Sequence, residues 1–348
     1  MNAQITGLGW VTPLGRSLAA VWTGIQKGTR PAPSPMAKPI GGSPAECLKV
    51  PAGSVDDAAA LPRLRRSSAI SHFAVAAATD AVADAGLDAA QLARTALVFA
   101  ASDGGVVYTR RFFSDIIERG EGAGSPLLFP ETVYNAPASH IASRLGLENE
   151  LLTLVGDAAT GLAAVRTGCE LLQTGDVDHC LVVAAQESDW VTWEAYARWH
   201  LIGDQGRERA LFSEGAAALV LSRQGTGCAV ARSHPGVSCK SERDASGRLD
   251  ALLAEMLGET APALAISGAS GTRLDAIELG CLKKRAASAA LLHPKFTLGE
   301  SMACSALQHV VAGTLALRNQ MPGPILVTAA GFHRQISALL LTQGGTHG

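Results

Sequence analysis

The first candidate for a reactive site in the sequence is a short turn between an apolar strand and an amphipathic helix. Leu151–Val155 is predicted to be a short buried strand, because it is an apolar run with β-branched residues that ends at a glycine. From Thr160 onward, apolar residues recur at spacings of three and four, which predicts a helix. The turn within residues 153–161 would offer free backbone N–H groups and the positive end of a helix dipole. A thiol at this turn would have a lowered pKa and would be a good nucleophile.

This turn resembles the nucleophile turn of β-ketoacyl-acyl-carrier-protein synthases, in which a strand leads into Thr-Ala-Cys-Ala-Ser-Gly. Ala158 stands at the cysteine position, and a methyl group cannot carry an acyl chain. The resemblance extends over nearly the whole chain, through Ile5–Gly15, Arg66–Leu87, Asn135–Leu147, Gly175–Ala185 and Ser213–Leu221. It implies a thiolase-like, layered α/β/α/β/α fold built from two related halves, which we place at residues 1–223 and 224–348.

The second half keeps the framework of this family but lacks both of its catalytic histidines. The first belongs to an Ala-His-Gly-Thr-Gly-Thr motif, and the stretch that resembles it, Ile266–Thr272, has Ser270 there. The second follows a lysine in a Lys-x-x-x-Gly-His pattern, where this chain keeps Lys295 but has Glu300. His293 and His309 lie nearby in sequence and are interpreted as structural. The resemblance therefore implies a chain with no catalytic residues for condensation.

Two acidic residues add to this interpretation. Asp157 would raise the pKa of a neighbouring thiol, although a cap of the following helix is the preferred interpretation of its carboxylate. Glu300, if ionised, would repel both a malonyl carboxylate and an enolate. In addition, Phe332 lies in Gly331–Arg334, where the family has a Gly-Phe-Gly-Gly turn beside its active site.

Composition argues for a large, well-packed intracellular protein. The chain has 348 residues, of which 47% are hydrophobic and only 17% charged, and so few charges favour an extensive subunit interface. A net charge of −2 gives no reason to expect nucleic acid or a membrane surface as a partner. Without an apolar run near ~18 residues or a signal peptide, we expect a cytoplasmic protein with no membrane span. The seven cysteines and nine histidines show no metal-ligand spacing, and no cofactor is expected.

Two functions from different classes remain open. The first is a non-catalytic subunit similar to the chain-length factors of type II polyketide and aryl-polyene systems, which pair with an active ketosynthase and serve an acyl carrier protein. In it, Tyr134, Asn135 and Phe332 are candidates for lining the interface and the partner's acyl tunnel. The second is an acyltransferase or hydrolase that uses Asp157, Ser270, Lys295 or Glu300. The spacing of these residues does not bring together a nucleophile, a base and a residue that orients the base. A non-catalytic homodimer that binds an acyl ligand is a weaker alternative.

Overall fold

Two groups of five strands share one topology in the computed structural model, which describes residues 3–36, 45–199, 201 and 211–344. When the strands are numbered in chain order within each group, both groups have the order 3-2-4-5-1, with parallel and antiparallel pairs at the same places. The first group consists of β1 (Ala3–Val11), β4 (Thr95–Ala101), β5 (Leu151–Val155), β6 (His179–Gln186) and β8 (Gly215–Ser222). The second consists of β9 (Cys228–Ser233), β11 (Leu264–Ile266), β12 (Ala290–Leu292), β13 (Ile325–Ala330) and β14 (Gln335–Gln343).

The two groups are joined where β1 runs antiparallel to β9, with Gln4 opposite Ala229. The division of the chain at residues 223 and 224 remains our proposal, and this repeated topology supports it. The short strand β10 (Val237–Ser238) pairs with β14. A separate three-stranded sheet contains β2 (Ser34–Met36), β3 (Ala45–Leu48) and β7 (Phe212–Ser213).

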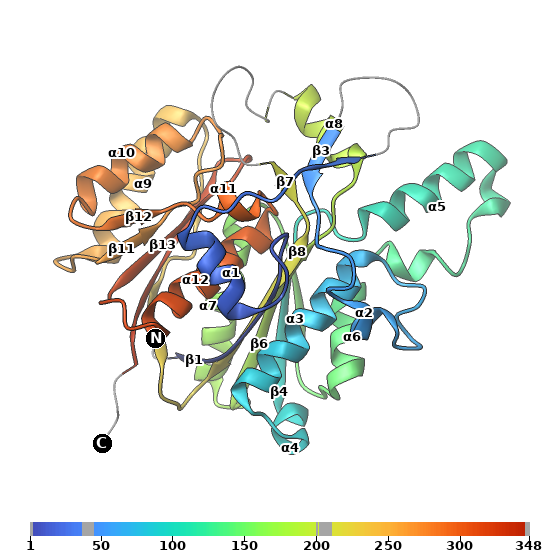
Figure 1. Cartoon of the computed structure of the whole chain (residues 1–348), viewed down its shortest axis with the longest axis horizontal. Helices are drawn as coiled ribbons and strands as arrows, with labels where there is room; N and C mark the ends of the chain where they lie inside the picture. Colours follow the sequence, from blue (N-terminus) through green and yellow to red (C-terminus); the bar gives the residue numbers. More distant parts are fainter. Residues whose placement is uncertain (1–2, 37–44, 200, 202–210, 345–348) are drawn as a thin grey trace.

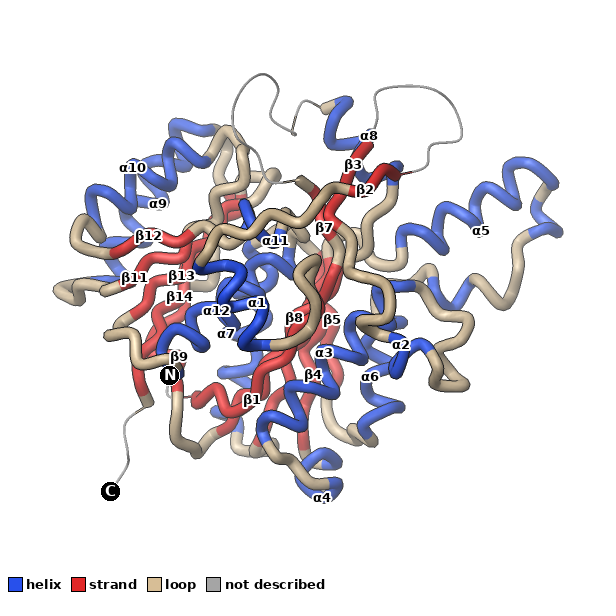
Figure 2. Tube along the Cα trace, viewed as in Figure 1, coloured by secondary structure: helices blue, strands red, loops and turns tan. Residues whose placement is uncertain are grey.

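Helices separate and cover the two groups of strands (Figures 1 and 2). Between the groups lie α7 (Ala159–Thr174) and α12 (Ala303–Arg318), whose apolar residues form one cluster with strands of both. The outer face of the first group is covered by α3 (Ala69–Ala85) and α6 (Ala136–Leu145), and that of the second by α9 (Glu242–Leu257) and α10 (Asp275–Arg285). The predicted α/β/α/β/α layering is therefore confirmed.

The remaining helices are shorter or lie outside these layers. They are α1 (Leu18–Gln26), α2 (Asp56–Ala59), α4 (Ala89–Ala93), α5 (Val106–Arg119), η1 (Glu121–Ala123), η2 (Phe129–Glu131), α8 (Trp190–Arg198) and α11 (Lys295–Leu298). Figure 1 shows α5 projecting away from the strands, and the residues from Val106 to Glu131 are called the arm below. No helix among the described residues is long and apolar enough to cross a membrane.

The structure corrects the prediction that Leu151–Val155 is a buried strand. This segment is β5, the last strand of its group, and among the described strands it pairs with β4 alone. Leu152 is 39% exposed and Val155 is 50% exposed. An apolar run of this length is typical of a central strand, but in the described residues β5 lies at the end of the sheet and is partly exposed.

Candidate functional site

The turn after β5 places Ala158 at the start of α7, as the sequence predicts. Ala158 is 2% exposed and acts as the N-cap residue, with helical φ and ψ of −49° and −40°. The N–H of Thr160 donates to the carbonyl of Asp157 at 2.9 Å, which closes the first turn. The turn therefore has the shape expected of a nucleophile turn, but its central side chain is a buried methyl group.

Asp157 does not cap α7, contrary to our preferred interpretation. No side chain caps this helix, and Asp157 Oδ2 instead accepts the backbone N–H of His333 at 2.8 Å. The contact requires a glycine at 331, because a Cβ there would lie 1.9 Å from Oδ2. Asp157 thus ties the 331–334 turn to the start of α7. This tertiary contact spans 176 residues and outcompetes the local cap.

Glu300 and Lys295 form a buried ion pair. Lys295 Nζ donates to Glu300 Oε2 at 2.6 Å, and both side chains are only 2% exposed. The other oxygen, Oε1, accepts the N–H of Met302 at 2.8 Å, and Met302 has a positive φ of 54° just before α12. The carboxylate is therefore held on both oxygens, where it neutralises a buried ammonium and stabilises a strained turn.

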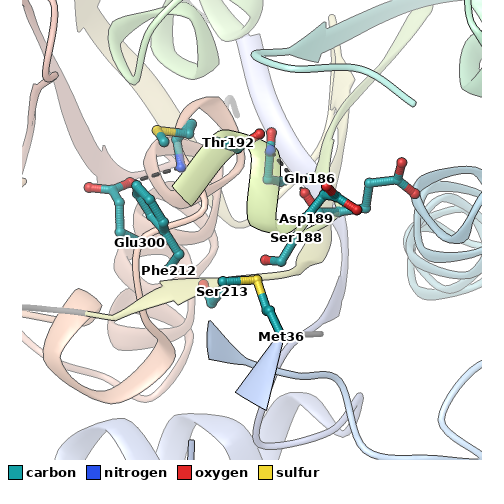
Figure 3. Close-up of a pocket in the computed structure, with 10 residues that line it drawn as sticks. Met36, Gln186, Ser188, Asp189, Thr192, Phe212, Ser213 and Glu300 are labelled. Carbon is teal, nitrogen blue, oxygen red and sulfur yellow. Dashed lines mark hydrogen bonds between the residues drawn. The ribbon is translucent and has the colours of Figure 1, made fainter. Parts of the chain in front are cut away.

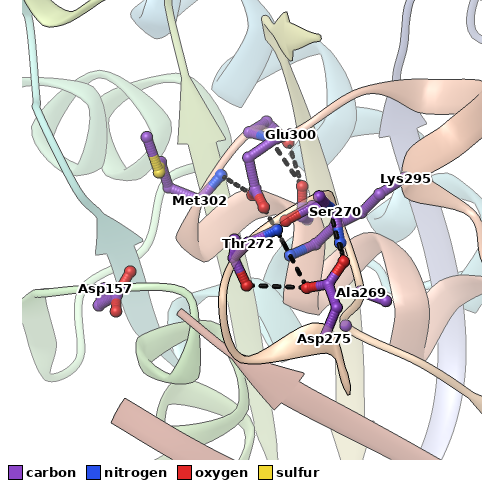
Figure 4. A network of polar contacts seen from close by, with 12 residues as sticks. Asp157, Ala269, Ser270, Thr272, Asp275, Lys295, Glu300 and Met302 are labelled. Atoms are coloured by element: carbon purple, nitrogen blue, oxygen red, sulfur yellow. Dashed lines mark hydrogen bonds and ion pairs between the residues drawn. The ribbon is translucent and has the colours of Figure 1, made fainter. Parts of the chain in front are cut away.

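Ser270 lies in a loop that Asp275 organises. The N–H groups of Ser270 and Gly271 donate to Asp275 Oδ2 at 3.1 and 2.6 Å (Figure 4). The hydroxyl oxygen of Ser270 has no hydrogen-bond partner among the described residues, and the side chain is 4% exposed. In Figure 4 Asp157 is set apart from the contacts around Asp275 and Glu300. No described base contacts Ser270, so the structure assembles no serine nucleophile there.

Glu278 is a buried residue of this region that the sequence prediction missed. It accepts the N–H of Gly268 at 2.7 Å and the hydroxyl groups of Ser267 and Thr328, and burial raises its pKa. A signal was available, because Leu274 and Leu282 lie four residues before and after it on the buried face of α10. Its contacts join the residues just after β11 to Thr328 within β13, which is a structural role.

The two nearby histidines are buried or half-buried, which is compatible with their interpretation as structural residues. His309 lies in the middle of α12, is 1% exposed, and has a pKa held well below its ordinary value by burial and by the charge of Lys295. His293 packs edge to face on Phe296, and burial lowers its pKa as well. Both rings are therefore neutral at physiological pH.

An aromatic cluster fills the space next to this site. Tyr196 packs against Phe332 and Phe212, with ring centroids 5.0 and 5.4 Å apart, and both phenylalanines also contact each other. The ring of Phe332 lies half-buried in this cluster, and its predicted place at a tunnel or an interface stays a prediction. Tyr196 was not singled out in the sequence, because its partners are distant in the chain.

Cavities lie on both sides of the cluster. On the inner side, Phe212, Glu300 and Met302 line a cavity with about 10 Å³ of water-accessible volume, enough for a single water molecule (Figure 3). On the outer side, Phe332 and His333 line an open cavity of about 340 Å³.

The electrostatics of the site oppose negative charge. Burial raises the pKa of Tyr196, and the nearby carboxyl groups of Asp103, Asp157 and Glu300 raise it further. Burial also raises the pKa of Asp103 and of Asp157. An enolate or a malonyl carboxylate placed here would be repelled by these groups. Among the described residues, no group of His, Cys, Asp and Glu is arranged to hold a metal ion.

Tyr134 and Asn135 lie away from these groups, just after the arm and before α6. Tyr134 is 45% exposed, and its ring lies over Gly104. Asn135 is exposed as well and is the N-cap residue of α6. Both therefore lie at the surface, where another subunit could contact them.

Three solved structures share this fold over almost their whole length. The ishigamide ketosynthase/chain length factor is 19% identical, with a TM-score of 0.85 over 99% of this chain and 100% of that one. In AntDE:AntF, a type II polyketide acyl-carrier protein in complex with its ketosynthase bound to the hexaketide, the matching chain is 17% identical, with a TM-score of 0.82 over 98% and 99%. A β-ketoacyl synthase from Burkholderia phymatum STM815 is 16% identical, with a TM-score of 0.80 over 98% and 99%.

At these identities the likeness establishes the fold rather than the activity. A search of curated proteins found no significant match. The model of the β-ketoacyl synthase N-terminal domain matches residues 3–231, which is about two thirds of the 348 residues. The chain therefore belongs to the β-ketoacyl synthase family.

Proposed function

We propose that this chain is a non-catalytic ketosynthase-like subunit that pairs with an active β-ketoacyl synthase and shapes its acyl tunnel. The biosynthetic class is fatty-acid, polyketide or aryl-polyene assembly on an acyl carrier protein. The main observation behind the proposal is that Glu300 stands where the family has its second catalytic histidine. There, Glu300 is bound to Lys295 at 2.6 Å in a buried ion pair and cannot stabilise an enolate.

Two further features support the absence of condensation chemistry. Ala158 provides no nucleophile at a turn that is otherwise well formed. The aromatic cluster of Tyr196, Phe212 and Phe332 lies next to this site, and the cavity that Phe212 lines has only about 10 Å³ of water-accessible volume. An acyltransferase or hydrolase at this site would need an accessible nucleophile beside a base, and Ser270 has neither.

The surface supports pairing with another subunit. Large apolar side chains are exposed along the arm, at the segment after it, and on β5; they are Phe113, Ile117, Leu127, Phe129, Val133, Tyr134, Leu152 and Val155. Exposed apolar residues of this size gathered on a projecting helix and an uncovered strand edge are typical of an interaction surface. A ketosynthase of the same fold would offer a matching edge, and a second copy of this chain is the competing occupant.

The first experiment tests for catalysis by the chain alone. The purified protein is expected to take up no acyl group from acyl thioesters and to form no product from malonyl-carrier protein, because Ala158, Ser270 and Glu300 supply no nucleophile and no enolate stabiliser. Intact-mass analysis detects any adduct, and an active ketosynthase of the same organism is the positive control. A stable acyl adduct at any residue would contradict the proposal.

The second experiment tests the contribution to a partner's tunnel. In a complex with that ketosynthase, Tyr134→Ala is expected to shift the product distribution by at least one two-carbon unit, because the phenol is a candidate floor of the pocket and each buried CH₂ is worth about 0.8 kcal/mol. Tyr134→Phe keeps the bulk and should keep the product length. An unchanged profile in an intact complex would exclude Tyr134, and co-purification without any heteromeric complex would exclude the pairing itself.

A further inference from the structure

The open cavity on the outer side of the aromatic cluster is lined by basic and apolar side chains. Its volume of about 340 Å³ falls within the range of roughly 300–1,000 Å³ that is usual for small-molecule sites. Arg273, His333 and Arg334 line it, and so do the rings of Trp199 and Phe332. The cavity therefore combines donors of positive charge with apolar surface.

Arg273 has no hydrogen-bond or ion-pair partner among the described residues. It is exposed and lies in the loop just before α10. The carboxylate of Asp275, two residues further on, accepts three backbone N–H groups of this loop instead. A guanidinium group carries five N–H donors in a planar fork that matches a carboxylate or a phosphate. Those of Arg273 are free to bind a ligand.

Arg334 has a backbone conformation that suits glycine better than arginine. Its φ is 61°, in the left-handed region that residues with a Cβ disfavour. The turn is nonetheless well fixed, since the N–H of Arg334 donates to the carbonyl of Gly331 at 3.0 Å and its own carbonyl accepts the N–H of Cys239 at 2.9 Å. The backbone therefore gives no reason for an arginine here. Strain of this kind beside a cavity is typical of a functional position.

His333 is held in place beside Arg334. The hydroxyl of Tyr196 lies 3.1 Å from its Nε2, and its backbone N–H donates to Asp157 at 2.8 Å. Tyr196 stays protonated at neutral pH, because burial raises its pKa. When this hydroxyl donates to Nε2, the proton of the neutral imidazole is on Nδ1, which can donate to a ligand.

We propose that the outer cavity binds a small organic anion with an apolar tail. Arg273 and Arg334 hold its phosphate or carboxylate group by charge-assisted hydrogen bonds, and the rings of Trp199 and Phe332 contact the tail. Glu242, in the first turn of α9, is the one carboxylate among the described lining residues, so the two guanidinium groups outnumber it. The inference goes beyond the proposed function, because it concerns a ligand of this chain and needs no partner subunit.

Isothermal titration calorimetry of the chain alone tests the chemistry of the ligand. Octyl phosphate is expected to bind with a Kd below about 1 mM, and octanol, which has the tail without the charge, at least about tenfold more weakly. Inorganic phosphate, which lacks the tail, should also bind at least about tenfold more weakly. Octanoate is the second anion, and the tighter of the two anions identifies a phosphate or a carboxylate as the head group.

Two arginine variants locate the site. Arg273→Gln and Arg334→Gly should each weaken octyl phosphate about 10- to 100-fold, as expected for the loss of a hydrogen bond to a charged group. Arg334→Gly should unfold at no lower denaturant concentration than the unmodified chain, because glycine relieves the left-handed backbone. Weaker binding in this variant therefore cannot be ascribed to a damaged fold.

Two further variants serve as controls. Arg66→Gln removes an exposed arginine just before α3, in the first half of the chain, and should leave the affinity unchanged. Glu242→Gln removes the opposing charge and should tighten binding. Octyl phosphate that does not bind, octanol or inorganic phosphate that binds equally well, or an affinity that is unchanged in both arginine variants would overturn the inference. Failure of the proposed pairing would appear separately, in co-purification.

Discussion

Ala158→Cys is expected to leave chain elongation at the background level. The new thiol would occupy a well-formed turn at the start of α7, where N–H groups favour a thiolate. Burial and the neighbouring carboxyl group of Asp157 act in the opposite direction. Even an acylated cysteine would face Glu300 instead of an enolate-stabilising histidine. Because one such donor is worth about 100- to 1,000-fold in rate, the loss of two leaves about 10⁴- to 10⁶-fold to recover.

The measurement separates acylation from condensation. Intact mass after incubation with an acyl thioester reports self-acylation, which the variant can show, and product analysis with malonyl-carrier protein reports elongation, which it should not. Ala158→Ser is the matched control, since it has a similar volume and a far weaker nucleophile. Elongated product from the Ala158→Cys chain alone would mean that the catalytic groups lie elsewhere than at Ser270 and Glu300.

Local patterns in the sequence predicted the framework well. The strand-to-helix turn around Ala158 is determined by neighbouring residues. β5 was assigned correctly as a strand, but its burial was not. An apolar run indicates that the side chains of a strand will be buried. It does not show whether the residues that bury them belong to the same chain.

Contacts between distant residues could not be predicted in this way. Asp157 reaches His333, and Ser68 reaches Glu187, over 176 and 119 residues. In each case a side chain that is suited to a local cap takes a tertiary partner, because burial makes an unpaired carboxylate more costly than an uncapped helix end. Lys295 and Glu300 are five residues apart in the sequence, and the short helix α11 and Gly299, which has a φ of 83°, lie between the two charges that meet at 2.6 Å.

Breaking this ion pair is expected to have the largest effect on stability. Lys295→Met leaves the carboxylate of Glu300 buried without its cation, and Glu300→Gln leaves the ammonium of Lys295 with a neutral partner. Removing one member of a buried pair costs about 3–5 kcal/mol, because the other charge remains desolvated. Glu300→Gln should fall at the lower end of this range, since the amide oxygen can still accept from Met302 or from Lys295. Chemical denaturation gives the free energy of unfolding for each variant.

The double variant tests whether the charges of Lys295 and Glu300 are energetically coupled. Lys295→Met with Glu300→Gln removes both charges, so we expect it to be more stable than Lys295→Met alone and close to the unmodified chain, since replacing a whole buried pair is often neutral. Lys284→Met, which breaks the exposed contact with Asp250, is the control and should cost less than about 1 kcal/mol. If the two single losses simply add in the double variant, the charges are not coupled. Glu300 would then be free to act on a ligand, and the observation that carries the proposed non-catalytic role would be lost.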